Sequence, residues 1–417
     1  MTTYANVLTI AIPIFFFLVL VEILYGLVTK KKYYNLMDTL SSLSSGITNL
    51  LKDLLGIGII IISYPFIKKS ISIIELNESI HLYIIAFVCL DFASYWNHRL
   101  NHSINFFWNQ HVIHHSSQEF NLACALRQSI SNLLGYGAVF LIPAAFLGVP
   151  HKVISLLAPL HLFGQFWYHT KHIGKLGFLE YIFVTPSQHR VHHAINPEYI
   201  DKNYGQILIV WDKIFGSFQE ELDHIKPVYG ILRPAKTWNP ILINFKHLWQ
   251  LIQDAYHTEN IWDKVRIWFM PTGWRPEDVR LKFPIYIIED PQEYKKYHTA
   301  LSNPFLAWSF IQLGIGAFFM FHFFSILHQQ ESTFNYFYGV FIMIHIFSFT
   351  FAMDQSKYFI FAELIKLSFS LILIYVQKFS WFCLHGLNIY LIIFYLITSM
   401  IFTAYFSQKE KLILKTS

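Results

Sequence analysis

Long apolar runs recur along this chain, and the first extends almost unbroken from Ala5 to Val28. A helix that crosses a bilayer needs roughly twenty consecutive apolar residues, so this run is long enough to span one. Hydrophobic residues make up 54% of the chain and charged residues only 14%. Soluble proteins carry about a quarter charged residues. The sequence therefore predicts an all-α, polytopic integral membrane protein.

Further apolar runs predict the remaining spans. They cover residues 47–67, 81–96, 133–149, 153–168, 304–327, 334–353, 359–376 and 381–406. The two runs within 133–168 flank a Gly-Val-Pro-His turn and predict a transmembrane hairpin. We expect four regions. Residues 1–97 would form N-terminal transmembrane helices, and residues 98–230 a histidine-box core that includes the hairpin. Residues 231–303 would form a cap or interfacial segment, and residues 304–417 the C-terminal transmembrane helices.

Positive charge predicts the orientation in the membrane. Lys30, Lys31 and Lys32 follow the first run, and basic residues next to spans usually lie in the cytosol. Counting the spans from there places the end of the third run, the histidines and a helical cap on the cytosolic face. This membrane is expected to be the endoplasmic reticulum in a eukaryote or the inner membrane in a bacterium. The net charge of +5 is too small to indicate a nucleic-acid partner.

Histidines occur at regular spacing after the third run. One group is an HxxxH, and two groups share an HxxHH spacing: His98 and His102, then His111, His114 and His115, then His189, His192 and His193. Residues three or four apart lie on one face of a helix, so each group can present its imidazoles in one direction. The single His169, in a Tyr-His-Thr sequence, completes the set.

This residue set predicts a metal site. Imidazole binds iron, zinc or copper, whereas the cysteines Cys89, Cys124 and Cys383 form no CxxC pair. A tetrahedral ion needs four ligands, so this many histidines indicates two metal ions. Isolated histidines such as His161 and His345 are instead expected to be hydrogen-bonded core residues.

Ligand type favours iron over copper(I), because soft sulfur ligands are missing, but leaves zinc open. Iron held by several histidines at a membrane face can activate dioxygen, and a lipid in the bilayer can present a C–H bond to it while water is excluded. The histidines therefore predict a lipid C–H oxygenase or desaturase.

The sequence resembles the fatty acid hydroxylase/sterol desaturase superfamily, and within it the alkylglycerol monooxygenases. The resemblance is in the histidine boxes and in the flanking segments 91–99, 114–129, 185–193, 200–205, 211–216 and 228–230. It implies a non-haem di-iron monooxygenase that uses dioxygen and tetrahydrobiopterin to hydroxylate the ether-linked carbon of an alkylglycerol, releasing a fatty aldehyde. The implied metal ligands are His98, His102, His111, His114, His115, His169, His189, His192 and His193.

The same resemblance implies roles for residues outside the boxes. Tyr204, with Asp201 and Asn203 in the same motif, is expected near the reaction as a hydrogen-bond donor or substrate orienter. The other possibility for Tyr204 is a buried interface tyrosine. Arg127 and Gln128 are expected to bind the pterin or a lipid headgroup, although a structural ion pair is an alternative for Arg127.

Two positions depart from the family pattern. Ser103 stands where the family has a glutamate, and Gln188 replaces a histidine before the third box. His172, three residues after His169, is an additional candidate ligand.

Three alternatives remain open at this stage. A sterol or fatty-acyl hydroxylase or desaturase would keep the chemistry but need a separate electron-donor protein. A transporter or metal-storing protein would use the histidines to bind ions, although transport sites usually lie at the bilayer midplane. An intramembrane zinc protease is disfavoured because the sequence has no HExxH.

Overall fold

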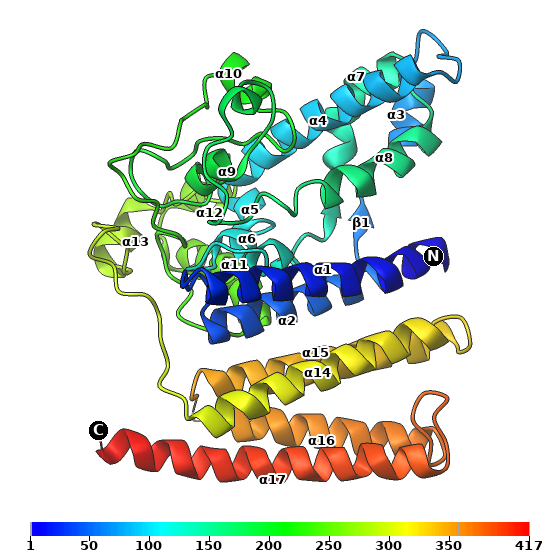
Figure 1. Cartoon of the computed structure of the whole chain (residues 1–417), viewed down its shortest axis with the longest axis vertical. Coiled ribbons are helices and arrows are strands. Elements are labelled where there is room, and N and C mark those ends of the chain that lie inside the picture. The colour runs from blue at the N-terminus through cyan, green and yellow to red at the C-terminus, as the bar shows by residue number, and fades with distance from the viewer. Residues whose placement is uncertain (1, 357, 417) are drawn as a thin grey trace.

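The computed structural model describes residues 2–356 and 358–416, and most of them are helical (Figure 1). The N-terminal part contains α1 (Thr2–Val28), α2 (Leu36–Leu54), β1 (Ile59–Ile60), α3 (Tyr64–Ile71) and α4 (Ile80–Ser103). The C-terminal part contains α14 (Asn303–Ile326), α15 (Ser332–Met353), α16 (Phe359–Val376) and α17 (Leu387–Thr416). The all-α prediction is confirmed, since the strands β1 and β2 (Leu134–Gly135) have two residues each.

The middle of the chain consists of shorter elements. Before the third histidine box these are α5 (Asn105–Trp108), α6 (Val112–His115), η1 (Cys124–Leu126), η2 (Gly137–Leu141), α7 (Ile142–Phe146), α8 (His151–Phe163) and η3 (Gly177–Tyr181). After it come α10 (Val210–Ile214), α11 (Pro240–His257), α12 (Ile261–Arg266) and α13 (Glu277–Lys282), while the box itself is in α9 (Pro186–His192). The η elements are single 3₁₀ turns.

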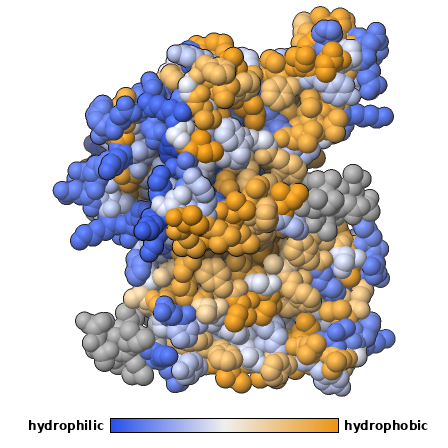
Figure 2. All heavy atoms as spheres, in the orientation of Figure 1, coloured by the Kyte–Doolittle hydropathy of each residue, from blue (hydrophilic) through white to orange (hydrophobic). Residues whose placement is uncertain are grey.

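Among the described residues, five helices are long and apolar enough to cross a membrane, and they indicate an integral membrane protein. They are α4, α14, α15, α16 and the Leu387–Phe406 part of α17. Figure 2 shows hydrophobic residues along these helices and hydrophilic residues gathered on the left of the view, over the middle region of the chain that contains α12 and α13. The exposed apolar side chains of the helices include Ile84, Phe318, Phe361 and Phe394. A bilayer is the solvent in which such side chains are stable.

Helix α2 begins and ends earlier than the apolar run at 47–67 predicted. It starts at the N-cap Asn35, whose side chain accepts hydrogen bonds from Met37 N and Asp38 N. Its first half is rich in serine, so hydropathy alone misses it. These polar side chains are nevertheless buried against the rest of the protein: Asp38, Ser41, Ser42, Ser44, Ser45 and Thr48. After Leu54 the chain turns at Gly56, which has a positive φ of 61°.

The region 133–168 does not form two full-length spanning helices. It consists of β2, η2, α7 and α8, and its apolar helical stretches Gly137–Phe146 and His151–Phe163 are short. Pro143 and Pro150 lie at helix starts, where a missing N–H is tolerated, and Gly148 (φ 70°) makes the turn between them. These elements pack with α3 and α4 around a shared apolar core that includes Ala86 and Ala144.

The helices α14 to α17 pack side by side and form the C-terminal bundle (Figure 1). Its core also includes one face of α2, through residues such as Leu40 and Leu51. The bundle encloses a polar network in which Lys366 Nζ lies 2.6 Å from Glu363 Oε1 and 2.8 Å from Ser399 Oγ. His345 is fully buried there and bonds the carbonyl of Gln312 at 2.9 Å, as expected for an isolated histidine.

Substitution of Lys366 by methionine tests this ion pair. The variant leaves the Glu363 charge buried without its cation, which we expect to lower the free energy of unfolding by about 3–5 kcal/mol. The double variant Glu363→Leu/Lys366→Met removes both charges and is expected to recover most of that loss. Denaturant unfolding in detergent micelles measures both, with Lys378→Met at an exposed lysine as the control. Equal losses in the single and double variants would contradict the prediction.

Candidate metal centre

The first histidine box lies at the C-terminal end of the apolar helix α4. Helix α4 starts at the N-cap Ser79 and ends where Ile104 turns extended. His98 and His102 are one turn apart near this end, and their ring centroids are 5.0 Å apart. Both rings are buried, so α4 places two imidazoles in the protein interior.

The remaining boxes lie on one short helix each. Helix α6 contains His114 and His115 and has His111 at its N-cap. Helix α9 begins with a capping box between Thr185 and Gln188 and with a proline in its first turn. Such short helices are unstable alone, so their geometry depends on caps and on packing. His169 follows α8 and donates from Nδ1 to the carbonyl oxygen of Gln165 at 3.0 Å.

The structure brings all nine predicted ligands together in two clusters. In each cluster the possible ligand atoms lie within 4.8 Å of one another. The five-histidine cluster contains His98, His102, His111, His115 and His192, and the four-histidine cluster contains His114, His169, His189 and His193. The two adjoin, because the rings of His115 and His193 stack with centroids 4.4 Å apart.

Burial keeps these imidazoles in the neutral form that binds metal. Desolvation lowers the pKa of His114 to about 4, and it lowers the pKa values of His111, His189 and His192 well below the usual 6.5. Neighbouring histidines lower several of these pKa values further by charge repulsion. Protonation of such rings is therefore disfavoured at neutral pH, and a lone pair is available on each.

Backbone carbonyls fix which ring nitrogen faces the cluster. The Nδ1 atoms of His98, His192 and His114 lie 2.8, 2.9 and 3.1 Å from the carbonyl oxygens of Tyr204, Lys202 and Arg127. An Nδ1–H that donates to a carbonyl leaves Nε2 as the ligand atom, an arrangement common around protein-bound metals.

The inward nitrogens fit metal ions well. Within the described residues, the buried Nε2 atoms of His102, His115 and His192 have no hydrogen-bond partner. An unpartnered buried polar atom is unfavourable, and coordination to a metal would satisfy it. In the four-histidine cluster, Nε2 of His189 lies 2.9 Å from Nε2 of His169 and 3.0 Å from Nε2 of His193. Both clusters can therefore hold a transition metal that prefers imidazole.

The predicted catalytic residues lie beside the five-histidine cluster. The ring of Tyr204 is buried, with its centroid 5.3 Å from that of His102. Asp201 Oδ1 is 3.9 Å from His102 Nδ1, and the Asp201 side chain is 64% exposed. The side-chain amide of Asn203 instead donates to the carbonyls of Gln188 and Gln219, so it fastens α9 to the following loop.

Arg127 and Gln128, the predicted pterin or headgroup ligands, lie at the four-histidine side. The Arg127 guanidinium is 2% exposed and pairs with Asp38 at 2.9 Å. Gln128 donates through its side chain to the carbonyl of Ala125. Their cofactor-binding role stays a prediction, and the structure places the Arg127 donors in the ion pair that the sequence offered as the alternative.

The positions that depart from the family pattern have local bonding roles. Ser103 Oγ donates to Arg99 O at 2.6 Å at the end of α4. Gln188 caps α9 through Thr185 N and Glu180 O. His172 lies outside both clusters, with its ring packed near those of Tyr25 and Tyr33.

Two buried carboxylates near the five-histidine cluster were not singled out from the sequence. Asp212 accepts from Tyr204 N and Gly205 N, both at 2.7 Å, and so fixes the carbonyl that His98 contacts. A Cβ at Gly205 would lie 2.8 Å from Asp212 Oδ2, so the close approach requires glycine.

Asp91 accepts from Ile207 N and from His161, confirming His161 as a bonded core residue. Asp91 and Asp212 lie in the segments 91–99 and 211–216 that resemble the family, and this was the sequence signal that could have identified them.

A cavity of about 580 Å³ opens onto the five-histidine cluster. Histidines of both clusters and many aliphatic side chains line it: His102, His115, His192, His193, Val112, Ile200, Ile231, Ile243 and Ile285. Arg233, Lys236 and Lys246 also line it. Arg233 Nη2 donates to Gly273 O, whereas its Nη1 has no partner among the described residues. The cavity therefore combines an apolar wall with positive charge.

Comparison with known proteins agrees with this geometry. Residues 83–217 match the fatty acid hydroxylase family, and both histidine clusters lie within this range. No solved structure matches the chain. The fold and the histidine site thus define a membrane protein of the fatty acid hydroxylase class.

Individual relatives narrow this assignment. The human alkylglycerol monooxygenase is 39% identical over 65% of this chain and 60% of its own length. The zebrafish alkylglycerol monooxygenase is 36% identical over 72% of this chain and 67% of its own length. An ornithine lipid hydroxylase of Rhizobium tropici is 30% identical over 32% of this chain and 41% of its own. The chain belongs to the alkylglycerol monooxygenase family, and it spans about three fifths of the human relative.

Metal counting tests the two clusters. We expect purified protein loaded with iron(II) to bind two metal ions per chain. His169→Ala leaves three ligands in its cluster, whereas His111→Ala leaves four in the other. We therefore expect His169→Ala to lose about one ion per chain under a chelator concentration that His111→Ala withstands. Elemental analysis after dialysis measures this, and equal retention by the two variants would contradict the assignment.

Proposed function

We propose that this protein is a membrane di-iron monooxygenase that hydroxylates the ether-linked carbon of an alkylglycerol. One observation carries the proposal: histidines of the five-histidine cluster line a cavity with an aliphatic wall. A lipid chain can lie along that wall while the reacting C–H bond faces the histidines. The relatives named alkylglycerol monooxygenase support an ether lipid over a sterol or a fatty acyl chain.

Bound iron would supply the activation of dioxygen, with tetrahydrobiopterin as the source of two electrons. One oxygen atom enters the C–H bond and the other leaves as water. The resulting hemiacetal splits into a fatty aldehyde and a glycerol. Nine neutral histidines would hold the two ions, and the closed apolar surroundings would keep water from the reaction.

The residues around the cavity have separate tasks in this proposal. Tyr204 and Asp201, beside His102, would orient the oxygen-bearing end of the substrate. Burial raises the pKa of the Tyr204 hydroxyl, which keeps it protonated as a donor. Arg233, which has an unpartnered Nη1 in the cavity wall, would bind the polar end of the lipid.

The proposed location of this reaction is the cytosolic membrane face. The histidines lie at one end of α4, next to the hydrophilic cap, and basic residues follow the first span. A lipid in that leaflet would need to move only a short distance along the bilayer into the cavity.

Aldehyde release tests the activity. Detergent-purified, iron-loaded protein would receive a 1-O-alkylglycerol and tetrahydrobiopterin under air. We expect fatty aldehyde that requires both compounds and that is lost in His102→Ala. Bound iron without aldehyde would reject the ether-lipid substrate and direct the search to sterols or fatty acyl chains with a protein electron donor.

A bulky residue in the cavity tests where the lipid binds. Ile285→Trp fills part of the cavity wall without touching a histidine cluster. We expect it to reduce aldehyde formation by about tenfold or more, because the lipid can no longer reach its reactive position. Metal content should be unchanged. Val265→Trp at an exposed cap position is the control, and wild-type turnover in Ile285→Trp would place the lipid elsewhere.

A further inference from the structure

We propose that two buried carboxylates of the N-terminal helices, Glu22 of α1 and Asp38 of α2, are positioning residues for the four-histidine metal site. Both lie outside the range that matches the fatty acid hydroxylase family. Each bonds chain segments directly next to a ligand of that cluster. The inference rests on the metal binding proposed above.

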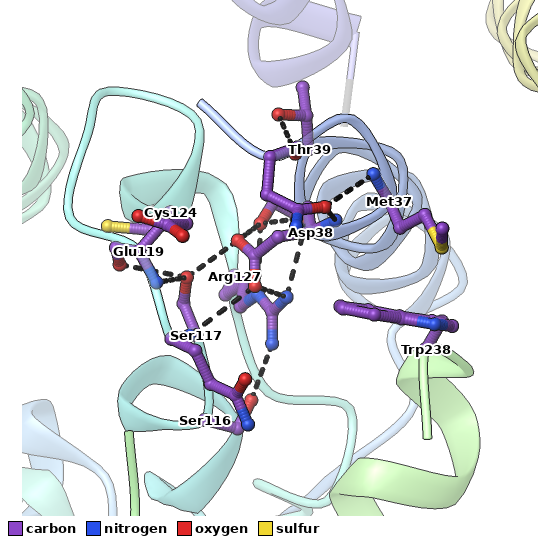
Figure 3. A network of polar contacts seen from close by, with 12 residues as sticks. Met37, Asp38, Thr39, Ser116, Ser117, Glu119, Cys124, Arg127 and Trp238 are labelled. Carbon is purple, nitrogen blue, oxygen red and sulfur yellow. Dashed lines mark hydrogen bonds and ion pairs between the residues drawn. The ribbon is translucent and has the colours of Figure 1, made fainter. Parts of the chain in front are cut away.

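Asp38 holds the segment that follows the second histidine box (Figure 3). Its Oδ1 accepts from Arg127 Nη2 at 2.9 Å, and its Oδ2 accepts from Ser117 Oγ at 2.7 Å. Arg127 also donates to Ser116 Oγ at 2.8 Å. Asp38 and Arg127 are both nearly inaccessible to solvent. The network therefore ties α2 to the two serines directly after the box, in a place where a broken ion pair would be strongly unfavourable.

The link from this network to the metal site is the backbone of Arg127. Its carbonyl oxygen lies 3.1 Å from Nδ1 of His114, so this histidine donates there and directs Nε2 into the cluster. The guanidinium is held by Asp38 and by Ser42 Oγ at 2.9 Å, which fixes the residue that presents the carbonyl. Asp38 therefore orients His114 through Arg127.

Glu22 makes an equivalent connection to His169. Its carboxylate accepts from the hydroxyls of Thr170 and Tyr34 and from Leu122 N at 2.8 Å. Thr170 is the neighbour of the ligand His169. Among the described residues, no cation lies in ion-pair contact with Glu22, and the side chain is buried. A buried carboxylate in such a position is stabilised by these hydrogen bonds.

The five-histidine cluster has different supports. Asp212 fixes Tyr204, whose carbonyl receives His98, and Lys202 O receives His192. Because Asp38 acts on His114 through Arg127 and Glu22 bonds the neighbour of His169, loss of either carboxylate should weaken the four-histidine site more than the five-histidine site. A general loss of folding would weaken both.

The test compares metal binding in Asp38→Asn and Glu22→Gln with the wild type, using iron(II) and elemental analysis after dialysis against graded chelator. Changes to groups that orient metal ligands typically reduce metal affinity by about 10- to 100-fold. We expect each variant to lose one of two ions at a chelator concentration that the wild type withstands. Asp53→Asn, a partly exposed acid of α2, is the matched control and should keep both.

Combined variants identify the site. Asp38→Asn added to His169→Ala should remove no further metal, whereas Asp38→Asn added to His111→Ala should remove one of the two ions that His111→Ala alone retains. If the carboxylate variants do not fold, Ser117→Ala and Thr170→Val remove the hydroxyls that bond Asp38 and Glu22, and they should weaken the same site several-fold in the same assay.

Three results would overturn the inference: two ions held as in the wild type, loss of both ions together, or loss from the five-histidine cluster. Wild-type protein without metal would instead overturn the proposed function.

Discussion

Nine neutral imidazoles packed in the interior of a membrane protein are the constraint on which the rest of this structure depends. Their mutual contacts and their burial would be unfavourable without metal ions, because several inward nitrogens have no other partner. The surrounding helices and backbone carbonyls restrict the orientation of these rings. Helix α4 supplies one pair, α9 is held by its capping box, and backbone carbonyls bond His114 and His192.

The two clusters differ in ligand number, access and support. The five-histidine cluster contributes three histidines to the cavity wall and has Tyr204 and Asp201 beside it, whereas the four-histidine cluster contributes His193 and packs against aromatic rings, including Phe120 and Tyr168. This difference fits a division in which the substrate binds next to the five-histidine site and the four-histidine site holds the second metal ion. Glu22 of α1 and Asp38 of α2 would stabilise the four-histidine site from outside the range that matches the fatty acid hydroxylase family.

Much of this site could be predicted from the sequence because helical spacing is a local property. His98 and His102 share a face of α4 for the same reason that any residues four apart do. The cavity could not be predicted in this way, because Arg233 and Ile285 come from cap loops whose position depends on packing. Helix α2 was placed wrongly, since its serines suggest exposure while the tertiary structure buries them.

The sequence by itself determined the membrane-embedded helical class and the complete set of histidines, since hydropathy and ligand spacing are written in consecutive residues. Only the tertiary structure decided how nine ligands divide into two clusters. That division depends on contacts between residues such as His102 and His192, which lie far apart in the chain and whose separation no local pattern encodes. It also decided that Arg127 is buried against Asp38, because the partner of a buried charge is chosen by the fold and not by its neighbours in the chain.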